Sequence, residues 1–259
     1  MDHSPQPACR GRMSKLRRTS VQLSLRRYSL KRNRFRHQHF ALTWALSLLA
    51  VVPASAQSEH PVTGRRIAPV MSASGADWLE RSEREQEEQP EKALDALNLR
   101  PGLMVGDIGA GTGFYSLRIA KRIGPAGRVY ANDIQPEMLQ RLSVNAALQK
   151  VSNIETVLGT ESDPKLPAGQ LDLVILVDVY HEFSRPQRML DRIRESLKPD
   201  GRLVLLEFRK EDPSVPIRPE HKMSVSEVKA EIIPEGYLFE KTVETLPWQH
   251  IIFFRKAVP

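Results

Sequence analysis

The feature that most constrains the fold of this chain is a regular alternation of apolar and amphipathic segments after residue 101. Leu171–Val177 (LDLVILV) is nearly continuous apolar chain, which is typical of a strand buried on both faces of a parallel sheet. Strands that alternate with helices at this spacing predict an α/β fold with a doubly wound sheet. The expected strands are Leu103–Ile108, Arg128–Asn132, Asn153–Leu158, Leu171–Val177 and Arg202–Phe208, and the expected helices are Phe114–Ile123, Pro136–Lys150 and Pro186–Leu197.

The C-terminal part of the chain departs from this alternation. A helix is expected near Ser226–Ile233, and two β-rich runs follow it, Tyr237–Val243 and His250–Phe254. The short link Glu244–Gln249 between the two runs favours an antiparallel hairpin.

Charge is distributed unevenly along the 259 residues. Of the 38 Lys and Arg side chains, eleven lie in residues 1–56, where Asp2 is the only acid, and the rest of the chain carries 27 basic and 30 acidic side chains. A nucleic-acid-binding surface needs clustered positive charge. The mildly acidic balance of residues 57–259 therefore argues against a nucleic-acid partner.

Residues 1–56 have the organisation of a secretory signal peptide. A basic stretch without acids, residues 10–39, precedes the apolar run Phe40–Val52, and small residues precede a cleavage site after Ala56. The apolar run is shorter than the roughly 20 residues that span a bilayer. We therefore expect a periplasmic or secreted protein that begins at Gln57 and has no stable membrane insertion after cleavage.

Two further features of this leader bear on its destination. Arg26–Lys31 (RRYSLK) resembles the twin-arginine export signal, and cleavage would remove Cys9, the only cysteine of the chain. A cysteine-free mature protein suits an oxidising compartment. An organelle transit peptide and an uncleaved cytoplasmic start are the alternatives.

The region after the leader divides into two parts. Residues 57–75 are rich in Pro, Ser and Gly and lack periodicity, so we expect a linker. Residues 76–259 are expected to form the domain, with residues 76–100 as an N-terminal helical lid. The acid-rich stretch within Asp77–Leu97 predicts a solvated helix face, and Pro90 is expected in the first turn of a second helix.

A glycine-rich motif, Asp107–Phe114 (DIGAGTGF), occupies the junction between a strand and a helix. Gly109, Gly111 and Gly113 accept backbone angles that a Cβ forbids and let the chain approach a nucleoside. Asp133 ends the next expected strand, 20 residues after Gly113, where a carboxylate can accept hydrogen bonds from both hydroxyls of a ribose. Ligands of doubly wound sheets bind beyond the carboxyl ends of the strands, where both features fall.

The spacing of the glycines separates two classes of ligand. Dinucleotide-binding motifs have G-x-G-x-x-G, whereas this chain has G-x-G-x-G with Asp107 just before it. That carboxylate would repel the pyrophosphate of NAD, but it would not repel a sulfonium-bearing amino acid. The spacing and the lack of a second mononucleotide-binding half disfavour an NAD-linked oxidoreductase.

The motif DIGAGTGF resembles motif I of the class I S-adenosylmethionine-dependent methyltransferases, and LKPDGRLVLLEF (197–208) resembles the segment that leads into their fifth strand. The resemblance covers roughly Glu91–Lys256. It is nearest to the small-molecule group of ubiquinone/menaquinone-type and methyltransferase-domain-11-like enzymes. It implies a Rossmann-like, seven-stranded, mostly parallel sheet with an antiparallel last strand and helices on both faces.

The same resemblance implies S-adenosylmethionine as cofactor and a small molecule as methyl acceptor. The family also has an acid at the adenine, after the third strand, and Glu161 and Asp163 are both candidates for that position. The other implied cofactor-binding residues are Asp107, Gly109, Ala110, Gly111, Thr112, Gly113, Asp133, Ile134 and Asp178.

The acceptor is expected beside Asp178–Phe183 (DVYHEF), at the end of the fourth strand. Methyl transfer from a sulfonium needs alignment and exclusion of water, and it needs a base where the nucleophile must lose a proton. Histidine has the side-chain pKa nearest to neutrality, so His181 is the expected base and Glu182 its orienting partner. Tyr180 completes this candidate catalytic group, as a wall of the pocket more than as a catalyst. A purely structural role for His181 is the alternative.

Other polar segments leave alternatives open. The stretch from Glu207 to Met223 is either a polar acceptor site or a salt-bridged surface loop, and Pro247–His250 is either a packed corner or a pocket rim. His181, Glu182 and His221 show no recognised metal-ligand spacing, so no metal site is predicted. The alternative to an enzyme is an exported, non-catalytic protein that binds S-adenosylmethionine or a nucleoside.

Overall fold

The computed structural model describes residues 58–257, so the predicted signal peptide lies outside the described residues. The strands are β1 (Met104–Ile108), β2 (Arg128–Asp133), β3 (Ile154–Leu158), β4 (Leu171–Val177), β5 (Leu197–Arg209), β6 (Lys222–Met223), β7 (Tyr237–Val243) and β8 (Gln249–Lys256). The α-helices are α1 (Ala76–Leu79), α2 (Arg84–Glu88), α3 (Pro90–Leu97), α4 (Phe114–Ile123), α5 (Pro136–Leu148), α6 (Pro186–Ser196) and α7 (Val225–Ile232). Four 3-10 helices complete the described elements: η1 (Ala73–Gly75), η2 (Tyr180–Glu182), η3 (Pro219–His221) and η4 (Ile233–Glu235).

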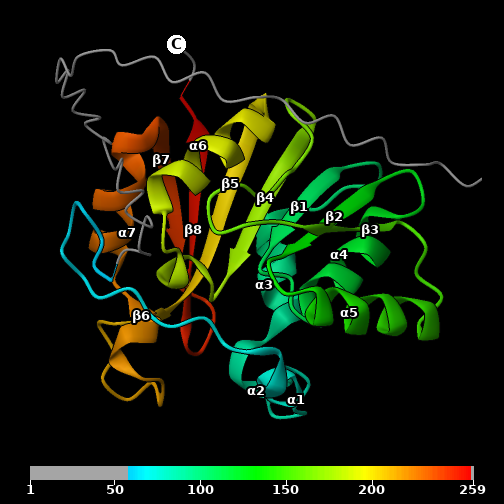
Figure 1. Ribbon diagram of the computed structural model, residues 1–259, viewed down its shortest axis with the longest axis horizontal. Helices are drawn as coiled ribbons and strands as arrows, with labels where there is room; N and C mark the ends of the chain where they lie inside the picture. Colours follow the sequence, from blue (N-terminus) through cyan, green and yellow to red (C-terminus); the bar gives the residue numbers. More distant parts are fainter. Residues whose placement is uncertain (1–57, 258–259) are drawn as a thin grey trace, which may run out of the picture. The chain divides into compact units, whose positions relative to one another are not determined.

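The strands form one sheet in the order β3-β2-β1-β4-β5-β8-β7, and the short β6 pairs with β5 off this path (Figure 1). β8 runs antiparallel to β5 and to β7, while the other pairs of described strands are parallel. The predicted fold class is therefore confirmed, including the antiparallel last strand. The strand order reverses between β1 and β4, which is where doubly wound sheets bind their ligands.

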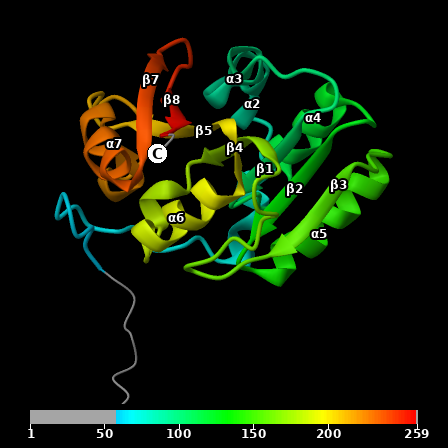
Figure 2. The same cartoon turned by 90° about the horizontal axis from the view of Figure 1, so that it is seen from above.

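Helices cover both faces of the sheet (Figure 2), and each face carries a separate hydrophobic core. Alternate residues of β5 divide between them: Val204 and Leu206 belong to the core that includes α3 and α4, whereas Leu203 and Leu205 belong to the core that includes α6 and α7. Successive side chains of a strand point to opposite faces, so a strand covered by helices on both sides must be apolar throughout. This accounts for the continuous apolar run that the sequence shows at β4.

Proline marks the start of three helices. Pro90, Pro136 and Pro186 occupy the first turns of α3, α5 and α6, where the missing N–H has no intrahelical partner to lose. In the part of the chain that the structure describes, every helix is too short or too polar to cross a membrane.

β5 is longer than the sequence predicts. It begins at Leu197, which pairs with Leu171, and the next pair joins Arg202 to Leu173. The strand register shifts between these pairs, so β5 contains an irregularity just before Arg202, where the strand was expected to begin.

Residues 58–72, which we call the strap, were expected to be a linker but pack against the domain. The strap runs past the ends of the strands toward α1 in Figure 1, and its Ile67 is buried. Arg65 donates hydrogen bonds to both carboxylate oxygens of Glu231 on α7 and a further one to the backbone oxygen of His181. These buried contacts fix the strap at the edge where ligands are expected.

The predicted helical lid is also packed more closely than its charge indicates. Arg84 is only 6% exposed and Glu88 only 1%, although both belong to the acid-rich stretch that was expected to be solvated. Both side chains point inward and line the cavity of the candidate active site.

Candidate active site

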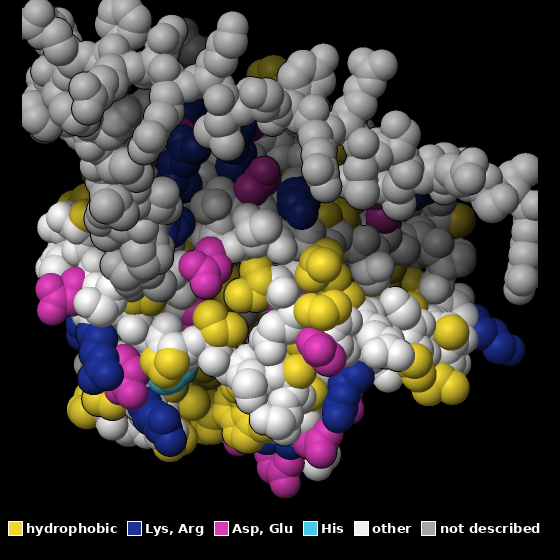
Figure 3. Space-filling model, in the orientation of Figure 1, with side chains coloured by type: hydrophobic (Ala, Val, Ile, Leu, Met, Phe, Trp, Pro, Cys, Tyr) yellow, Lys and Arg dark blue, Asp and Glu magenta, His cyan; other side chains and the backbone are white. Residues whose placement is uncertain are grey.

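One cavity of about 1030 Å³ lies at the carboxyl ends of β1, β2 and β4. The strap and α2, which precede β1 in the chain, contribute residues to its wall. In Figure 3, hydrophobic side chains lie among charged ones along the lower edge, the edge at which α1 and α2 lie in Figure 1. The walls of the cavity include residues 66–71, 107–112, 132–135, 177–179, 181–184 and 216–218, together with Ser58, Arg84, Glu88, Tyr115, Glu161, Phe208 and His221.

The glycine loop after β1 has the backbone conformation that its sequence predicts. Gly109, Gly111 and Gly113 have φ angles of 70°, 54° and 92°, a region that favours glycine. A Cβ at Gly109 would lie 2.5 Å from Val179 Cγ2, and one at Gly113 would lie 2.8 Å from Leu142 Cγ. The side chains of Val179 and Leu142 thus leave no room for a Cβ at Gly109 and Gly113, which is a second reason for glycine at these positions. Between the glycines, Ala110 and Thr112 line the cavity.

Asp133 ends β2 directly beside this loop. Its Oδ2 accepts a hydrogen bond from the Gly111 N–H at 3.0 Å, and its Oδ1 accepts one from the Gln135 N–H at 2.9 Å. Each carboxylate oxygen retains a lone pair for a ligand. The next residue, Ile134, also lines the cavity. The carboxylate is therefore held as a rigid pair of acceptors, as recognition of two ribose hydroxyls requires.

Asp107 is buried at the end of β1. Its Oδ2 accepts a hydrogen bond from Ser116 Oγ at 2.6 Å, and burial raises the pKa of Asp107 to about 7. The charge of Asp133 makes a smaller contribution to this increase. Two neighbouring buried carboxyl groups favour a ligand that is cationic or rich in hydrogen-bond donors.

The structure separates the two candidates for the adenine position. Glu161 lines the cavity, where its Oε2 accepts a hydrogen bond from Ser184 Oγ at 2.9 Å. Asp163 lines a different, smaller pocket, and its Oδ1 accepts a hydrogen bond from the Lys165 N–H. The geometry therefore favours Glu161.

Three buried oxygen atoms near the glycine loop lack a hydrogen-bond partner within residues 58–257: Glu88 Oε2, Tyr115 Oη and Asp178 Oδ1. Glu88, Tyr115 and Asp178 all line the cavity. Burial raises the pKa of Asp178 well above its usual range, and the charge of Glu88 raises it further. Unsatisfied buried acceptors are costly, so a ligand group with several N–H donors would stabilise this site.

This observation tests whether S-adenosylmethionine fits the cavity. An ammonium group carries three N–H donors, and the three unpartnered oxygens suit the amino group of the methionine part. Arg84 lies next to them, with its Nε 2.6 Å from Glu88 Oε1 and its guanidinium over the ring of Phe114. Sequence reasoning missed Arg84 and Glu88, because an acidic helix with scattered arginines has the pattern of a solvated surface.

His181 lies in η2, just after β4, and contacts a buried acid. Its Nδ1 is 2.6 Å from Glu207 Oε2, while Glu207 Oε1 accepts a hydrogen bond from the Tyr180 N–H at 3.0 Å. An ionised carboxylate only accepts hydrogen bonds, so the proton lies on Nδ1 and Nε2 carries the lone pair. The residue that orients His181 is therefore Glu207 on β5, and not Glu182 as expected.

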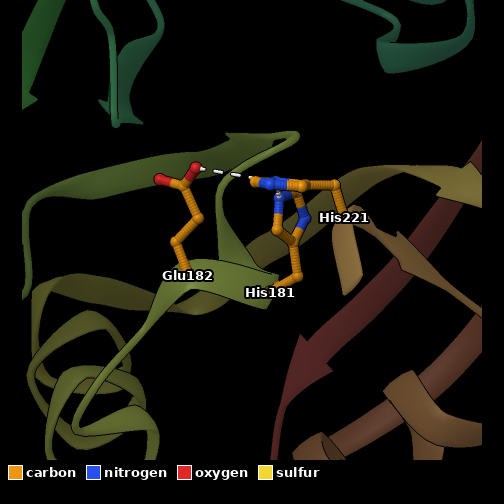
Figure 4. A group of neighbouring side chains, drawn as sticks. All are labelled: His181, Glu182 and His221. Carbon is orange, nitrogen blue, oxygen red and sulfur yellow. Dashed lines mark hydrogen bonds and ion pairs between the residues drawn. The ribbon is translucent and has the colours of Figure 1, made fainter. Parts of the chain in front are cut away.

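The other nitrogen of His181 contacts a second histidine (Figure 4). His181 Nε2 lies 3.1 Å from His221 Nδ1, and Glu182 Oε1 lies 4.0 Å from the same His221 atom. Burial lowers the pKa of His221 and raises the pKa of Glu182 to about 7. All three side chains line the cavity, so they form a polar cluster in its wall.

Tyr180 does not occupy the expected place. Its side chain is fully buried in the core shared with α6 and α7, and its hydroxyl lies 3.5 Å from His60 Nε2. Val179 and His181, the neighbours of Tyr180 in sequence, line the cavity. Tyr180 itself is not among the described residues that line it. The prediction of a catalytic or wall position for Tyr180 is therefore wrong.

The segment after β5 divides between its two predicted alternatives. His221 reaches the cavity, whereas Glu211 binds His250, with 2.8 Å between Glu211 Oε2 and His250 Nε2. His250 Nδ1 also lies 2.8 Å from Glu244. The corner at Pro247–His250 is thus packed and ion-paired.

Known proteins resemble this chain in the same region. A family model described as a methyltransferase domain matches residues 105–201. Nocamycin O-methyltransferase from Saccharothrix syringae is 30% identical over 140 residues, which cover 54% of this chain and 48% of that protein. The ubiquinone/menaquinone biosynthesis C-methyltransferase of Paraburkholderia phymatum is 35% identical over 113 residues, which cover 44% of this chain and 46% of that protein. The chain spans about half the length of these curated relatives.

A solved structure extends the similarity to most of the described fold. The S-adenosylmethionine-dependent methyltransferase from Aquifex aeolicus is 26% identical, with a TM-score of 0.69, and the match covers 73% of this chain and 100% of that chain. The range that the family model matches includes the glycine loop, Asp133 and His181, all of which line the cavity. Residues 105–201 therefore match a methyltransferase domain, and the described fold is similar to that of an S-adenosylmethionine-dependent methyltransferase.

Proposed function

We propose that the protein transfers the methyl group of S-adenosylmethionine to an ionisable hydroxyl of a small, mostly apolar molecule. The observation that carries this proposal is a single cavity with two different ends. The glycine loop, Asp133 and the unpartnered acids form one part of its wall, which we call the cofactor end; His181, whose Nδ1 contacts Glu207, forms another part, which we call the acceptor end. The volume of about 1030 Å³ is at the upper end of the roughly 300–1,000 Å³ typical of small-molecule sites. This volume suits a cofactor and an acceptor bound side by side.

The residues at the first end suit successive parts of the cofactor. Asp133 would accept hydrogen bonds from the ribose hydroxyls, Glu161 would lie at the adenine, and Glu88 and Asp178 would accept from the amino group. When bound, the cofactor supplies an electrophilic methyl carbon on a sulfonium. The buried carboxylates that surround the cavity stabilise this cationic ligand electrostatically.

The second end suits an acceptor that must lose a proton. His181 accepts the proton of the hydroxyl at Nε2, and the Glu207 carboxylate stabilises the resulting imidazolium. The oxygen–carbon bond then forms as the sulfur–carbon bond breaks. Ile67 and Met71 of the strap, together with Ile217, line the cavity with apolar side chains that limit the access of water.

The relatives support a small acceptor. The two curated proteins compared above are named as an O-methyltransferase of nocamycin and a C-methyltransferase of ubiquinone and menaquinone biosynthesis. The choice of oxygen for this chain comes from the lone pair of His181, because a hydroxyl is a nucleophile that a base activates.

Calorimetric titration with S-adenosylmethionine tests the cofactor end. Asp133→Ala should weaken binding by roughly 5- to 150-fold, which corresponds to the loss of about 1–3 kcal/mol of charged hydrogen bonds. Asp163→Ala is the matched control, since it removes the same side chain outside the cavity, and its affinity should equal that of the parent. Equal effects of the two substitutions would contradict the assignment.

The acceptor end is tested by release of S-adenosylhomocysteine in a screen of phenols, quinols, amines and carboxylates. His181→Ala should lower turnover of the best acceptor by roughly 10²–10⁴-fold and leave cofactor affinity unchanged. Tight cofactor binding without turnover of any compound would favour the non-catalytic alternative.

A further inference from the structure

We propose that His181, Glu182 and His221 bind a divalent metal ion of the Zn²⁺ class, and that the hydroxyl of the acceptor binds to this ion. The role assigned to the ion rests on the proposed function, but ion binding itself can be measured without cofactor or acceptor. The proposal departs from the sequence-based expectation of no metal site.

The ligand atoms already have nearly the spacing that a metal requires. Two nitrogen ligands at about 2.0–2.1 Å from a metal lie roughly 3.0–3.4 Å apart in octahedral or tetrahedral geometry. His181 Nε2 and His221 Nδ1 are 3.1 Å apart. The nearest Glu182 oxygen is 4.0 Å from His221 Nδ1, and one ligand atom from each of the three residues lies within 4.8 Å of the others. Rotation of the Glu182 side chain closes the remaining gap.

The arrangement around His181 is the one that metal-binding histidines have. Metal-bound imidazoles usually donate their second N–H to a carboxylate, which fixes the tautomer and the ring orientation. Glu207 is fully buried and accepts from His181 Nδ1, so the lone pair of Nε2 points toward His221. The two imidazole rings lie at 85° to each other. Figure 4 shows the two rings next to Glu182.

The backbone holds the two histidines rigidly. The backbone oxygen of His181 accepts hydrogen bonds from Arg65 and from the Ala68 N–H. His221 directly precedes Lys222, which pairs with Phe208, the residue after Glu207 on β5. The ligands and the orienting carboxylate are therefore connected through the sheet and the strap, which keeps the ligand set preorganised.

The composition of the site favours a borderline transition metal with free coordination positions. Two imidazoles and one carboxylate are the protein ligands of catalytic zinc in several hydrolases, with a further position for water or substrate. Mg²⁺ and Ca²⁺ prefer ligand sets of oxygen only. Since all three side chains line the cavity, the free positions face the acceptor.

Bound at this site, the ion changes how the acceptor loses its proton. The oxygen of the hydroxyl coordinates the ion, its pKa falls, and the proton passes to solvent. The oxygen–carbon bond then forms as the sulfur–carbon bond of the cofactor breaks, which leaves S-adenosylhomocysteine and the methylated acceptor. His181 then acts as a ligand, and its role as base is confined to the metal-free protein.

Metal binding is tested on untagged full-length protein that has been treated with a chelator and dialysed. Titration with Zn²⁺ alone should saturate the site at one ion per chain, and Co²⁺ should give visible absorption bands of an ion with nitrogen ligands. His221→Ala and His181→Ala should each lower Zn²⁺ affinity at least 100-fold. Glu207→Gln should lower it about 10–100-fold, as for other residues that orient a ligand.

Glu220→Gln is the matched control, since it neutralises a carboxylate beside His221 that is not part of the described cavity wall. Its Zn²⁺ affinity should equal that of the parent. The histidines of residues 1–56 are present in every variant, so their contribution cancels. S-adenosylmethionine titrations of the same variants show that each is folded and test the cofactor site separately.

Zn²⁺ affinities that are equal in the parent, His181→Ala and His221→Ala would overturn the proposal. Full turnover in excess chelator would overturn the role of the ion and leave His181 as the base. Loss of turnover in chelator that Zn²⁺ or Co²⁺ restores, but Mg²⁺ does not, would support the proposal.

Discussion

Single buried carboxyl groups dominate the chemistry of this cavity. Asp107, Asp133, Asp178 and Glu182 line it, and burial is the main cause that raises the pKa of each. A cationic ligand favours the ionised forms of these groups. Binding of the cofactor and release of protons are therefore linked, so cofactor affinity should depend on pH.

The effect of burial on the pKa of Asp107 can be measured without a ligand, through the pH dependence of stability. Its pKa is raised from 3.8 to about 7, so the folded protein retains a proton that the unfolded chain has lost. The contribution of Asp107 to stability is therefore highest below pH 4 and falls as the pH rises toward 7. In Asp107→Asn this loss disappears, because an amide does not ionise.

We expect the free energy of unfolding of Asp107→Asn, relative to the parent, to increase by on the order of 3 kcal/mol between pH 5 and pH 8. Urea denaturation at the two pH values, without cofactor, measures this difference. Taking the difference between variant and parent cancels the titration of other groups, such as Glu182. A difference that does not change with pH would show that Asp107 is ionised in the folded protein throughout.

Part of the site could be predicted from sequence at the level of single residues. Asp107 and Asp133 stand at fixed distances from a glycine motif, so local spacing was sufficient to find them. Glu207 and Glu88 were not assigned to the site, because their roles depend on contacts with residues distant in sequence. The 2.6 Å contact between Glu207 and His181 arises only when β5 pairs with β4.

At the scale of elements, the strap and α7 are joined by a buried ion pair. Glu231 is fully buried, and Arg65 binds both of its carboxylate oxygens. His60 Nε2 lies 3.3 Å from Glu231 Oε2. A buried acid with these partners holds the strap against the domain, and through the strap it holds one wall of the cavity.

Arg65→Ala should destabilise the protein by about 3–5 kcal/mol, since it leaves the Glu231 carboxylate buried without its main partner. Arg66→Ala is the matched control, because Arg66 is the next residue and is exposed; its effect should stay within about 0.5 kcal/mol. Chemical denaturation at neutral pH measures both changes.

A second substitution distinguishes a lost charge pair from lost packing. Adding Glu231→Gln to Arg65→Ala removes the orphaned charge and should restore part of the stability. If the double variant is as unstable as the sum of the two single variants, the contribution of Arg65 lies in packing instead.

Elements differ in how well their sequence predicts them. The bounds of α4 and β4 were predicted to the residue, because a complete apolar stripe or run bounded by breakers marks each one. β6 was missed, since a strand of two residues has no periodicity and forms only by pairing with β5. The strap was missed for the same reason: its order comes from Arg65 and Glu231, which lie far apart in the chain.

At the scale of the whole molecule, different strands of the sheet position the residues for the cofactor and those for the acceptor. The residues that suit the cofactor follow β1, β2 and β4, whereas the acceptor end is built from His181 after β4, Glu207 on β5 and His221 just before β6. This division follows from the reversal of strand order between β1 and β4. The topology was predictable from the alternation of segments, but the joining of the two ends in one cavity was not.

We also propose that the protein is exported. The pattern of residues 1–56 supports this, and mass spectrometry of protein from its native host should then show Gln57 as the first residue. Detection of the intact leader in a cytosolic fraction would refute the proposal. It would also mean that the protein and its cofactor are in the same compartment.

The position of the strap offers a way to observe ligand binding directly. Ser58 is exposed and yet lines the cavity, and residues 58–257 contain no cysteine. A thiol introduced by Ser58→Cys, in a chain that begins after Cys9, would therefore be unique. A fluorescent dye attached to it would sit at the rim, where its emission would report the filling of the cavity in real time.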